Sequence, residues 1–326
     1  MADHITSSEL KTILHSKRAN IYYLEHCRVL VNGGRVEYVT DEGKRSLYWN
    51  IPIANTTTVL LGTGTSVTQA AMRELAKAGV LVGFCGGGGT PLFSANEIDI
   101  EVAWFSPQSE YRPTEYLQHW VRFWFDDDLR LAAAKACQFA RLQRIREHWI
   151  SSRPLRDAGF EINPEVLGGV LDKARESVEF APDVTYLLTE EARLTKQLYK
   201  LAANAVRYGD FVRSKRGSGS DAANHFLDHG NYLAYGLGAT ATWVLGLPHG
   251  LAVLHGKTRR GGLVFDVADL VKDAVILPLA FVCAMRGDDE QEFRQACIES
   301  LTRTESLDFM IDTLKEVAER IGRMAQ

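Results

Sequence analysis

The sequence predicts an α+β protein, with a β-rich, β-sandwich-like domain at residues 1–104 and a larger all-α domain at residues 105–326. Two observations predict this division. Short runs of β-branched and aromatic residues between turn signals fill the first hundred residues, which is typical of strands. From about residue 110 the apolar residues recur at helical spacing. The chain of 326 residues is long enough for two domains that each have a core.

The β-rich domain is expected to contain several short strands and one helix. The expected strands are residues 20–24, 27–31, 35–40, 45–49, 57–61 and 80–84. Asn32–Gly34 predicts a hairpin turn, because glycine tolerates the positive φ that tight hairpins require. Ser66–Gln69 has the spacing of a capping box and predicts a helix through Ala78. This domain has no catalytic constellation, and exposed strand edges invite pairing, so we expect it to form a homodimer.

The all-α domain is expected to consist of helices joined by short turns. Its expected helices are residues 113–128, 129–150, 164–177, 183–211, 221–245, 264–285, 290–301 and 306–324. Asn163 followed by Pro164 is a typical start of a helix. The aromatic run Trp120–Phe125 could stack nucleic-acid bases, but its spacing fits core packing better.

Cysteine usage and hydropathy predict a cytoplasmic protein without a membrane partner. The five cysteines are scattered and odd in number, and none is spaced C-x-x-C, which fits a reducing compartment. The N-terminus has no apolar signal core. The longest apolar run, Ala274–Met285, is too short to span a bilayer and is interpreted as a buried helix.

The stretch Gly246–Asp273 gathers the most chemistry in the chain. His255 ends an apolar run, and Asp266 and Asp269 are the only acids of the helix expected after it. Residues three apart share a helical face, and two close carboxylates repel each other unless a proton or a cation intervenes. A metal ion or the neighbouring basic turn could supply that partner. The simpler alternative is a solvated helix edge.

A further ligand is expected from Glu190 or Glu191, because one of the pair must face inward if their helix packs. A carboxylate from this pair with Asp269 and His255 would offer two oxygen ligands and one nitrogen. Such a set suits Mn²⁺ well and Mg²⁺ acceptably. The alternative is an exposed helix start, where carboxylates favour the helix dipole.

Three basic clusters in the all-α domain are candidates for contacts with a phosphate backbone. They consist of Arg141 with Arg144, Arg213 with Lys215 and Arg216, and Lys257 with Arg259 and Arg260. The net charge of −4 excludes a molecule that is basic as a whole. Each cluster could instead be a solvated face that acids elsewhere balance.

Two segments carry a resemblance to a known family. Leu227–Gly236 and His249–Asp269, with the order Glu…His…Asp-x-x-Asp, resemble the CRISPR-associated spacer-acquisition integrase family and its type I-F branch. In this family the metal-binding acid is followed by a small residue and, eight positions on, by an aromatic residue. Glu191, with Ala192 and Tyr199, matches that pattern, whereas Glu190 does not. Whether Glu190 contributes as well is left open.

The resemblance implies a metal-dependent DNA endonuclease and integrase that joins the 3′-OH ends of short DNA fragments to a CRISPR repeat by transesterification. Glu191, His255 and Asp269 would hold Mg²⁺ or Mn²⁺, and Asp266 would orient or supplement them. The resemblance further implies a homodimer that works with a small companion subunit, which in this branch is fused to a helicase-nuclease.

Two other classes remain open at this point. One is a non-catalytic DNA-binding scaffold with a structural metal site. The other is a metal-dependent hydrolase of small phosphorylated substrates, which the net charge of −4 favours.

Since two close carboxylates repel each other, the sequence also predicts that Asp269→Ala leaves the metal-free protein as stable as before.

Overall fold

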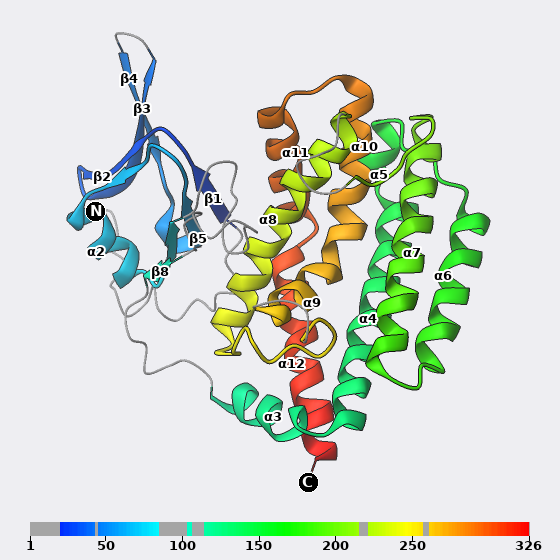
Figure 1. Ribbon diagram of the computed structural model, residues 1–326. Helices are drawn as coiled ribbons and strands as arrows, with labels where there is room; N and C mark the ends of the chain where they lie inside the picture. Colours follow the sequence, from blue (N-terminus) through cyan, green and yellow to red (C-terminus); the bar gives the residue numbers. More distant parts are fainter. Residues whose placement is uncertain are drawn as a thin grey trace. The chain divides into compact units, whose positions relative to one another are not determined.

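The computed structural model describes residues 20–42, 45–84, 103–105, 114–214, 221–256 and 261–325. The chain divides into two compact units, Met1–Arg112 and Pro113–Gln326. The order of the elements is strand-rich first and helical second (Figure 1), so the predicted fold class is confirmed. Each unit is described by itself.

The first unit contains two four-stranded sheets among its described residues. One sheet has the order β1-β5-β7-β8 and the other β4-β3-β2-β6. The strands are β1 (Asn20–Leu24), β2 (Arg28–Asn32), β3 (Arg35–Glu42), β4 (Arg45–Asn50), β5 (Thr56–Leu61), β6 (Ser66–Val67), β7 (Leu81–Phe84) and β8 (Ala103–Phe105). A 3-10 turn (Ile53–Asn55) precedes β5, and α2 (Gln69–Lys77) precedes β7. The pairs β1–β5, β5–β7 and β2–β6 are parallel.

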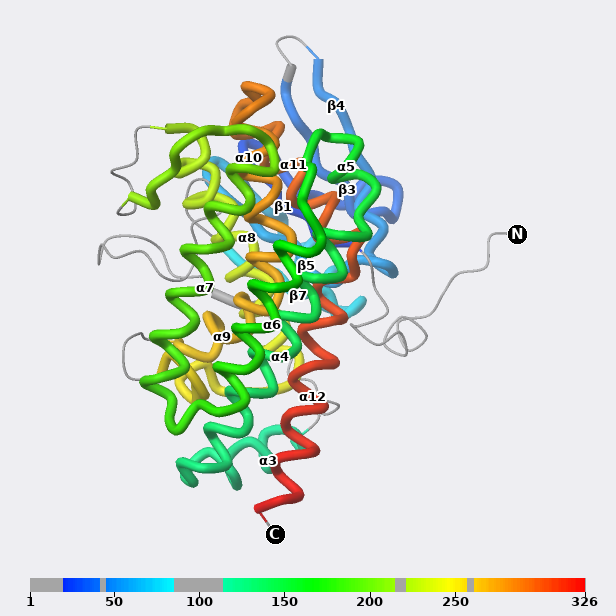
Figure 2. Tube along the Cα trace, turned by 90° about the vertical axis from the view of Figure 1, so that its right-hand side faces the viewer, coloured from blue at the N-terminus to red at the C-terminus, as the bar shows by residue number. Residues whose placement is uncertain are grey.

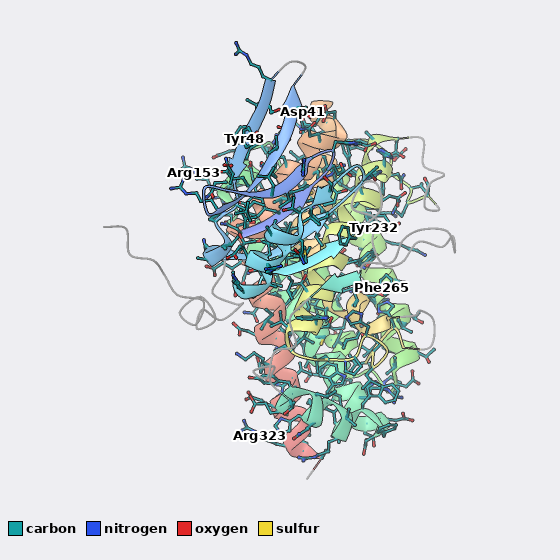
Figure 3. The ribbon with its side chains drawn as sticks, turned by 90° about the vertical axis from the view of Figure 1, so that its left-hand side faces the viewer. Asp41, Tyr48, Arg153, Tyr232, Phe265 and Arg323 are labelled. Carbon is teal, nitrogen blue, oxygen red and sulfur yellow. The ribbon has the colours of Figure 1, made fainter. Side chains whose placement is uncertain are left out.

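The predicted hairpin at Asn32–Gly34 joins β2 to β3. Gly33 and Gly34 have φ values of 55° and 80°, which residues with a Cβ atom rarely adopt, so the turn depends on glycine. Strands β3 and β4 continue as an exposed two-stranded arm, which carries Asp41 and Tyr48 (Figure 3). On this arm Trp49 stacks on Tyr38 with a centroid distance of 6.4 Å.

The predicted capping box at Ser66–Gln69 is wrong. Ser66 and Val67 form β6, which pairs with β2. The N-cap of α2 is Thr68, whose side chain accepts a hydrogen bond from the backbone N–H of Ala71 at 3.2 Å. The reason is tertiary, since pairing with β2 keeps residues 66 and 67 extended and starts the helix later.

All the elements described in the second unit are helical. Its helices are α3 (Glu115–Trp124), α4 (Asp127–Ser151), α5 (Arg153–Asp157), α6 (Pro164–Glu179), α7 (Val184–Ala205), α8 (Ala222–Val244), α9 (Gly262–Val271), α10 (Leu277–Arg286), α11 (Glu290–Arg303) and α12 (Ser306–Met324). Asn163 caps α6 as predicted, because its Oδ1 accepts from the N–H groups of Glu165 and Val166. Helices α4, α6 and α7 run side by side (Figures 1 and 2).

Helix α9 lies at the centre of this unit, and every one of its residues is buried. Its sides pack against α8, α4 and α12. The uniformly apolar sequence around Asp266 and Asp269 explains this position, since a helix that is apolar on all sides favours a core. The carboxylates of Asp266 and Asp269 are therefore surrounded by the core of the helical unit.

The helix expected at residues 264–285 is divided into three pieces. After α9 the chain forms a π-helical turn, η4 (Lys272–Ile276), and then continues as α10. Ala274 to Cys283 are buried as expected. Within the described ranges, no helix is long and apolar enough to cross a membrane.

Candidate metal centre

Asp266 holds the loop that carries His255. One oxygen, Oδ2, accepts from the backbone N–H groups of Val253 at 2.7 Å and Leu254 at 3.0 Å. The other, Oδ1, accepts from the backbone N–H of His255 at 3.0 Å and lies 2.8 Å from its Nδ1. Both oxygens of this buried carboxylate are thus engaged in positioning the loop.

The contact with Asp266 also fixes the orientation of the His255 ring. A carboxylate beside Nδ1 favours the proton on that nitrogen, so Nε2 becomes the nitrogen available to a metal ion. Nε2 lies 3.8 Å from Oε2 of Glu191. Burial alone would lower the pKa of His255, but the hydrogen bond with Asp266 and the nearby carboxylates of Asp269 and Glu191 raise it above its ordinary value.

Glu191, His255 and Asp269 converge from α7, the loop before α9, and α9 itself. One ligand atom from each lies within 4.8 Å of the other two. Helix α7 brings Glu191 inward, while Glu190 forms an ion pair with Arg193 on its own helix. The structure therefore brings Glu191 and not Glu190 into the cluster.

The carboxylate of Asp269 fits a metal ion. The residue is only 2% exposed, and neither oxygen accepts a well-formed hydrogen bond from any part of the chain that the structure describes. Its charge is balanced by an ion pair between Oδ1 and the ammonium of Lys272, one helical turn along. A buried carboxylate that lacks hydrogen bonds is costly unless a cation is nearby. Since Oδ2 has no hydrogen-bond partner among the described residues, it is the oxygen that suits a hard divalent cation.

The prediction that Arg141 contacts DNA is wrong. Its side chain is completely buried in α4. Nη1 donates to Oε1 of Glu191 at 3.1 Å, Nε donates to Oδ2 of Asp273 at 2.9 Å, and Nη2 donates to Thr195 at 3.0 Å. The side chain of Arg141 thus contacts α7 and η4 inside the helical unit, and it holds Glu191 of the candidate metal centre.

The remaining predicted phosphate contacts are either engaged elsewhere or not described. The guanidinium of Arg144 donates to the carbonyl of Thr304 and lies 4.7 Å from the ring centroid of Phe309, so it anchors the start of α12. Arg213 forms an ion pair with Asp228 and donates to Oδ1 of Asn224 at 2.8 Å. Five further residues lie outside the described residues: Lys215, Arg216, Lys257, Arg259 and Arg260.

Lys272 and Asp273 also belong to this site, and neither was predicted from the sequence. Both are largely buried in η4, and they contact Asp269 and Arg141 respectively. Lys272 lies three residues after Asp269, and this spacing on a helix indicates an ion pair. The contact of Asp273 with Arg141 joins residues 132 positions apart, and no local signal indicates it.

An apolar hollow lies beside the His255 loop. It is lined by residues from the end of α3, the start of α7 and the loop itself, including Trp124, Leu188, Leu254 and Gly256. Trp124 closes one side by donating to the carbonyl of Ala252 at 2.8 Å. The aromatic run at Trp120–Phe125 is thus divided, with Trp120 and Phe123 in the core and Phe125 75% exposed.

Fold and site together define a protein with a carboxylate–histidine cluster of metal-ligating geometry in a helical domain that follows a strand-rich one. The chain belongs to the Cas1 family, since the sequence model described as "CRISPR associated protein Cas1" matches residues 22–297. Its resemblance to the spacer-acquisition integrases is therefore confirmed.

Close relatives cover the whole chain. It is 73% identical to the CRISPR-associated endonuclease Cas1 of Pseudomonas aeruginosa strain UCBPP-PA14, over 98% of both chains. It is 65% identical to the protein of that name from Pectobacterium atrosepticum, over 100% of both. A Cas1 protein from Thermotoga maritima shares the fold with a TM-score of 0.66 at 18% identity, over 93% of this chain and 96% of that one. A casposase bound to its integration product gives a TM-score of 0.67 at 12% identity, over 92% and 91%.

Proposed function

We propose that this protein is a metal-dependent DNA endonuclease and integrase of CRISPR adaptation, which inserts short foreign DNA fragments into a CRISPR array by transesterification. The observation that carries the proposal is the convergence of Glu191, His255 and Asp269 on one point within the helical unit. Relatives named as endonucleases that are 73% and 65% identical over nearly the full length support it.

The chain's own residues have distinct tasks at this centre. Glu191, His255 Nε2 and Asp269 would hold the ion, and Asp266 would keep His255 in the required tautomer. Arg141 would hold Glu191 at its place. A divalent cation bound here supplies a positive charge that holds the scissile phosphate and favours the attacking oxygen.

The proposed ion is Mg²⁺ or Mn²⁺. Two carboxylates and one imidazole leave further positions of an octahedron for water and phosphate oxygens, which both ions accept. The nitrogen ligand favours Mn²⁺ when both are present in equal amounts.

The proposed DNA contacts lie in two segments of the helical unit. Lys257, Arg259 and Arg260 directly follow His255, so phosphates that reach the ion would pass close to them. Lys215 and Arg216 follow Arg213, which is itself anchored by Asp228. Basic side chains at these positions would fix the duplex by its backbone rather than by its sequence.

The proposed assembly is a homodimer through residues 1–104, working with a small companion Cas subunit that is fused to a helicase-nuclease. The exposed arm of β3 and β4 supports a role of this unit in assembly. Tyr48 and Trp49 on β4 are 57% and 49% exposed, and aromatic side chains so placed are typical of interfaces.

The test uses two neighbouring glutamates as a matched pair. Glu191→Gln should abolish cleavage and integration in Mn²⁺ and Mg²⁺ while DNA binding at low salt remains. Glu190→Gln should keep full activity, because Glu190 pairs with Arg193 and not with the centre. Equal activity of the two variants would contradict the site.

The same assay separates the other two classes. A DNA-binding scaffold would bind duplex DNA but cleave none with either ion. A hydrolase of small phosphorylated substrates would cleave those substrates and show no salt-dependent affinity for duplex DNA.

A further inference from the structure

A second cluster of metal-ligating side chains lies where the first turns of α8 meet the first residue of α11. It consists of His225, His229 and Glu290, and it shares no residue with the Glu191, His255 and Asp269 centre. No step of the proposed reaction uses it.

The geometry of this cluster is that of a chelate. His225 and His229 are four positions apart on α8 and therefore share a face, with ring centroids 4.4 Å apart. Oε1 of Glu290 lies 2.5 Å from Nε2 of His225, and Oε2 lies 3.9 Å from Nδ1 of His229. One ligand atom from each residue lies within 4.8 Å of the other two.

Independent contacts hold the two helix ends together. Asp289 caps α11 through a capping box with Glu292, which fixes the backbone at Glu290. Below the cluster, Phe226 of α8 stacks on Phe293 of α11 with a centroid distance of 4.5 Å. The three ligands are therefore brought together by the fold and do not depend on an ion for their positions, which lowers the cost of binding one.

We propose that His225, His229 and Glu290 form a second metal site, which binds a transition-metal ion of the Zn²⁺ type. Two imidazoles and one carboxylate are a three-residue ligand set that Zn²⁺ accepts, with a fourth position open. The all-oxygen preference of Mg²⁺ disfavours that ion here. Zn²⁺–nitrogen bonds of about 2.0–2.1 Å place the ligand atoms of a tetrahedral site roughly 3.3 Å apart. The pair at 2.5 Å would therefore move apart and the pair at 3.9 Å would move together, and side chains that are 30–48% exposed can rotate that far.

The bound ion would fasten the start of α11 to α8. Because both helices pack on the core around η4, such a link would stabilise the helical unit by mass action. The side chain exposure of the cluster also leaves the fourth position open to water or to a ligand from another molecule.

The test measures metal binding by the full chain. Zn²⁺ should bind by equilibrium dialysis, and Co²⁺ in its place should give visible absorption bands. His229→Ala and Glu290→Gln should each weaken this binding at least about tenfold, and His229→Gln should do so while keeping a polar side chain of similar length. The control His26→Asn, which alters an exposed histidine of the other unit, should change neither readout.

Two further measurements distinguish this site from the first centre. Asp269→Asn should keep the Co²⁺ bands that depend on His229, while His229→Ala should keep wild-type DNA cleavage in Mg²⁺. If His225→Ala with His229→Ala binds as much Zn²⁺ as wild type and shows the same bands, the cluster is only an ion pair and the proposal is wrong. Loss of the bands in Asp269→Asn would likewise overturn it.

Discussion

Arg141 donates from Nη1 to Oε1 of Glu191 at 3.1 Å, and the arginine side chain has no exposed surface. The same guanidinium reaches Asp273 on η4. Three segments that are far apart in the sequence are thus joined behind the metal centre. Carboxylates on two sides hold the guanidinium charged, since they raise its pKa in spite of burial. The position of Glu191 therefore depends on Arg141.

Replacing Arg141 should affect both stability and metal affinity. Arg141→Ala leaves two largely buried carboxylates without their partner and should cost about 3–5 kcal/mol of unfolding free energy. Arg141→Lys keeps the charge but loses the planar fork, so metal affinity should still fall. Urea unfolding and Mn²⁺ titration measure the two effects.

The matched control for this prediction is Arg146→Ala on the same helix. Arg146 pairs with Asp172 at the surface, where its side chain is 46% exposed. An exposed pair contributes about 0–1 kcal/mol, so this variant should unfold close to wild type. If both variants lost similar amounts of unfolding free energy, the buried ion pairs of Arg141 would contribute no more to stability than an exposed pair.

Asp266→Asn should weaken metal binding without removing a ligand. The amide keeps only one acceptor oxygen for Val253, Leu254 and His255, and it no longer favours a proton on Nδ1. Loss of such a supporting contact typically costs about 10–100-fold in metal affinity. The pKa of His255 should fall, because a carboxylate that raises it is gone. Calorimetric titration with Mn²⁺ and NMR titration of His255 would check these outcomes, and an unchanged pKa would contradict the assignment.

Asp269→Ala should destabilise the metal-free protein, contrary to the expectation from repulsion between two carboxylates. The structure gives Asp269 a close ammonium partner, Lys272, which the variant would leave buried and unpaired. A loss of about 3–5 kcal/mol is expected in the absence of metal. Wild type should gain about 2.7 kcal/mol with Mn²⁺ at one hundred times its Kd, and the variant should gain far less.

The control for Asp269 is a double variant. Asp269→Ala combined with Lys272→Met removes both charges and should recover most of the lost stability, but not the stabilisation by Mn²⁺. If the single variant melts at the wild-type temperature without metal, the ion pair contributes nothing.

His148 should make the protein less stable in mild acid. Burial, with Arg144 and Arg303 nearby, lowers its pKa to about 4. Between pH 6.5 and pH 4 the unfolded chain binds a proton that the folded protein does not, so stability falls as pH falls. The two pKa values of His148, in the unfolded and folded states, differ by about 2.5, which corresponds to a loss of roughly 3 kcal/mol of unfolding free energy once both states are protonated.

His148→Gln should flatten this part of the pH profile, measured by urea unfolding at pH 7, 5.5 and 4. His26→Asn is the control, because His26 is exposed in the other unit. Parallel profiles for wild type and His148→Gln would show that His148 does not titrate in this range.

The proposed homodimer should depend on the strand-rich unit. A chain that begins at Pro113, the start of the helical unit, should sediment as a monomer, whereas the full chain should sediment as a dimer. Tyr48→Ser with Trp49→Ser in the full chain removes two exposed aromatic side chains and should weaken the dimer. A dimer that survives removal of residues 1–112 would place the interface on the helices.

The order of strands and helices, and three residues of the candidate metal centre that lie together, could be predicted from the sequence. Short runs of β-branched and aromatic residues between turns predicted the strands, and apolar residues at helical spacing predicted the helices. His255 and the Asp266–Asp269 pair stood out because acids are unusual in an apolar helix. The choice of Glu191 over Glu190 came from family resemblance, and the packing of α7 agrees with it.

The directions of the charged side chains depend on tertiary packing and could not be predicted from the sequence. Arg141 reads as a surface base on α4, yet its carboxylate partners lie 50 and 132 residues away. The parallel pairing of β1, β5 and β7 and the π-helical turn η4 also depend on neighbours distant in the chain. A helical face is defined by residues three and four apart, but its partner is defined by how separate helices pack. The burial of a charge is therefore a property of the packed protein.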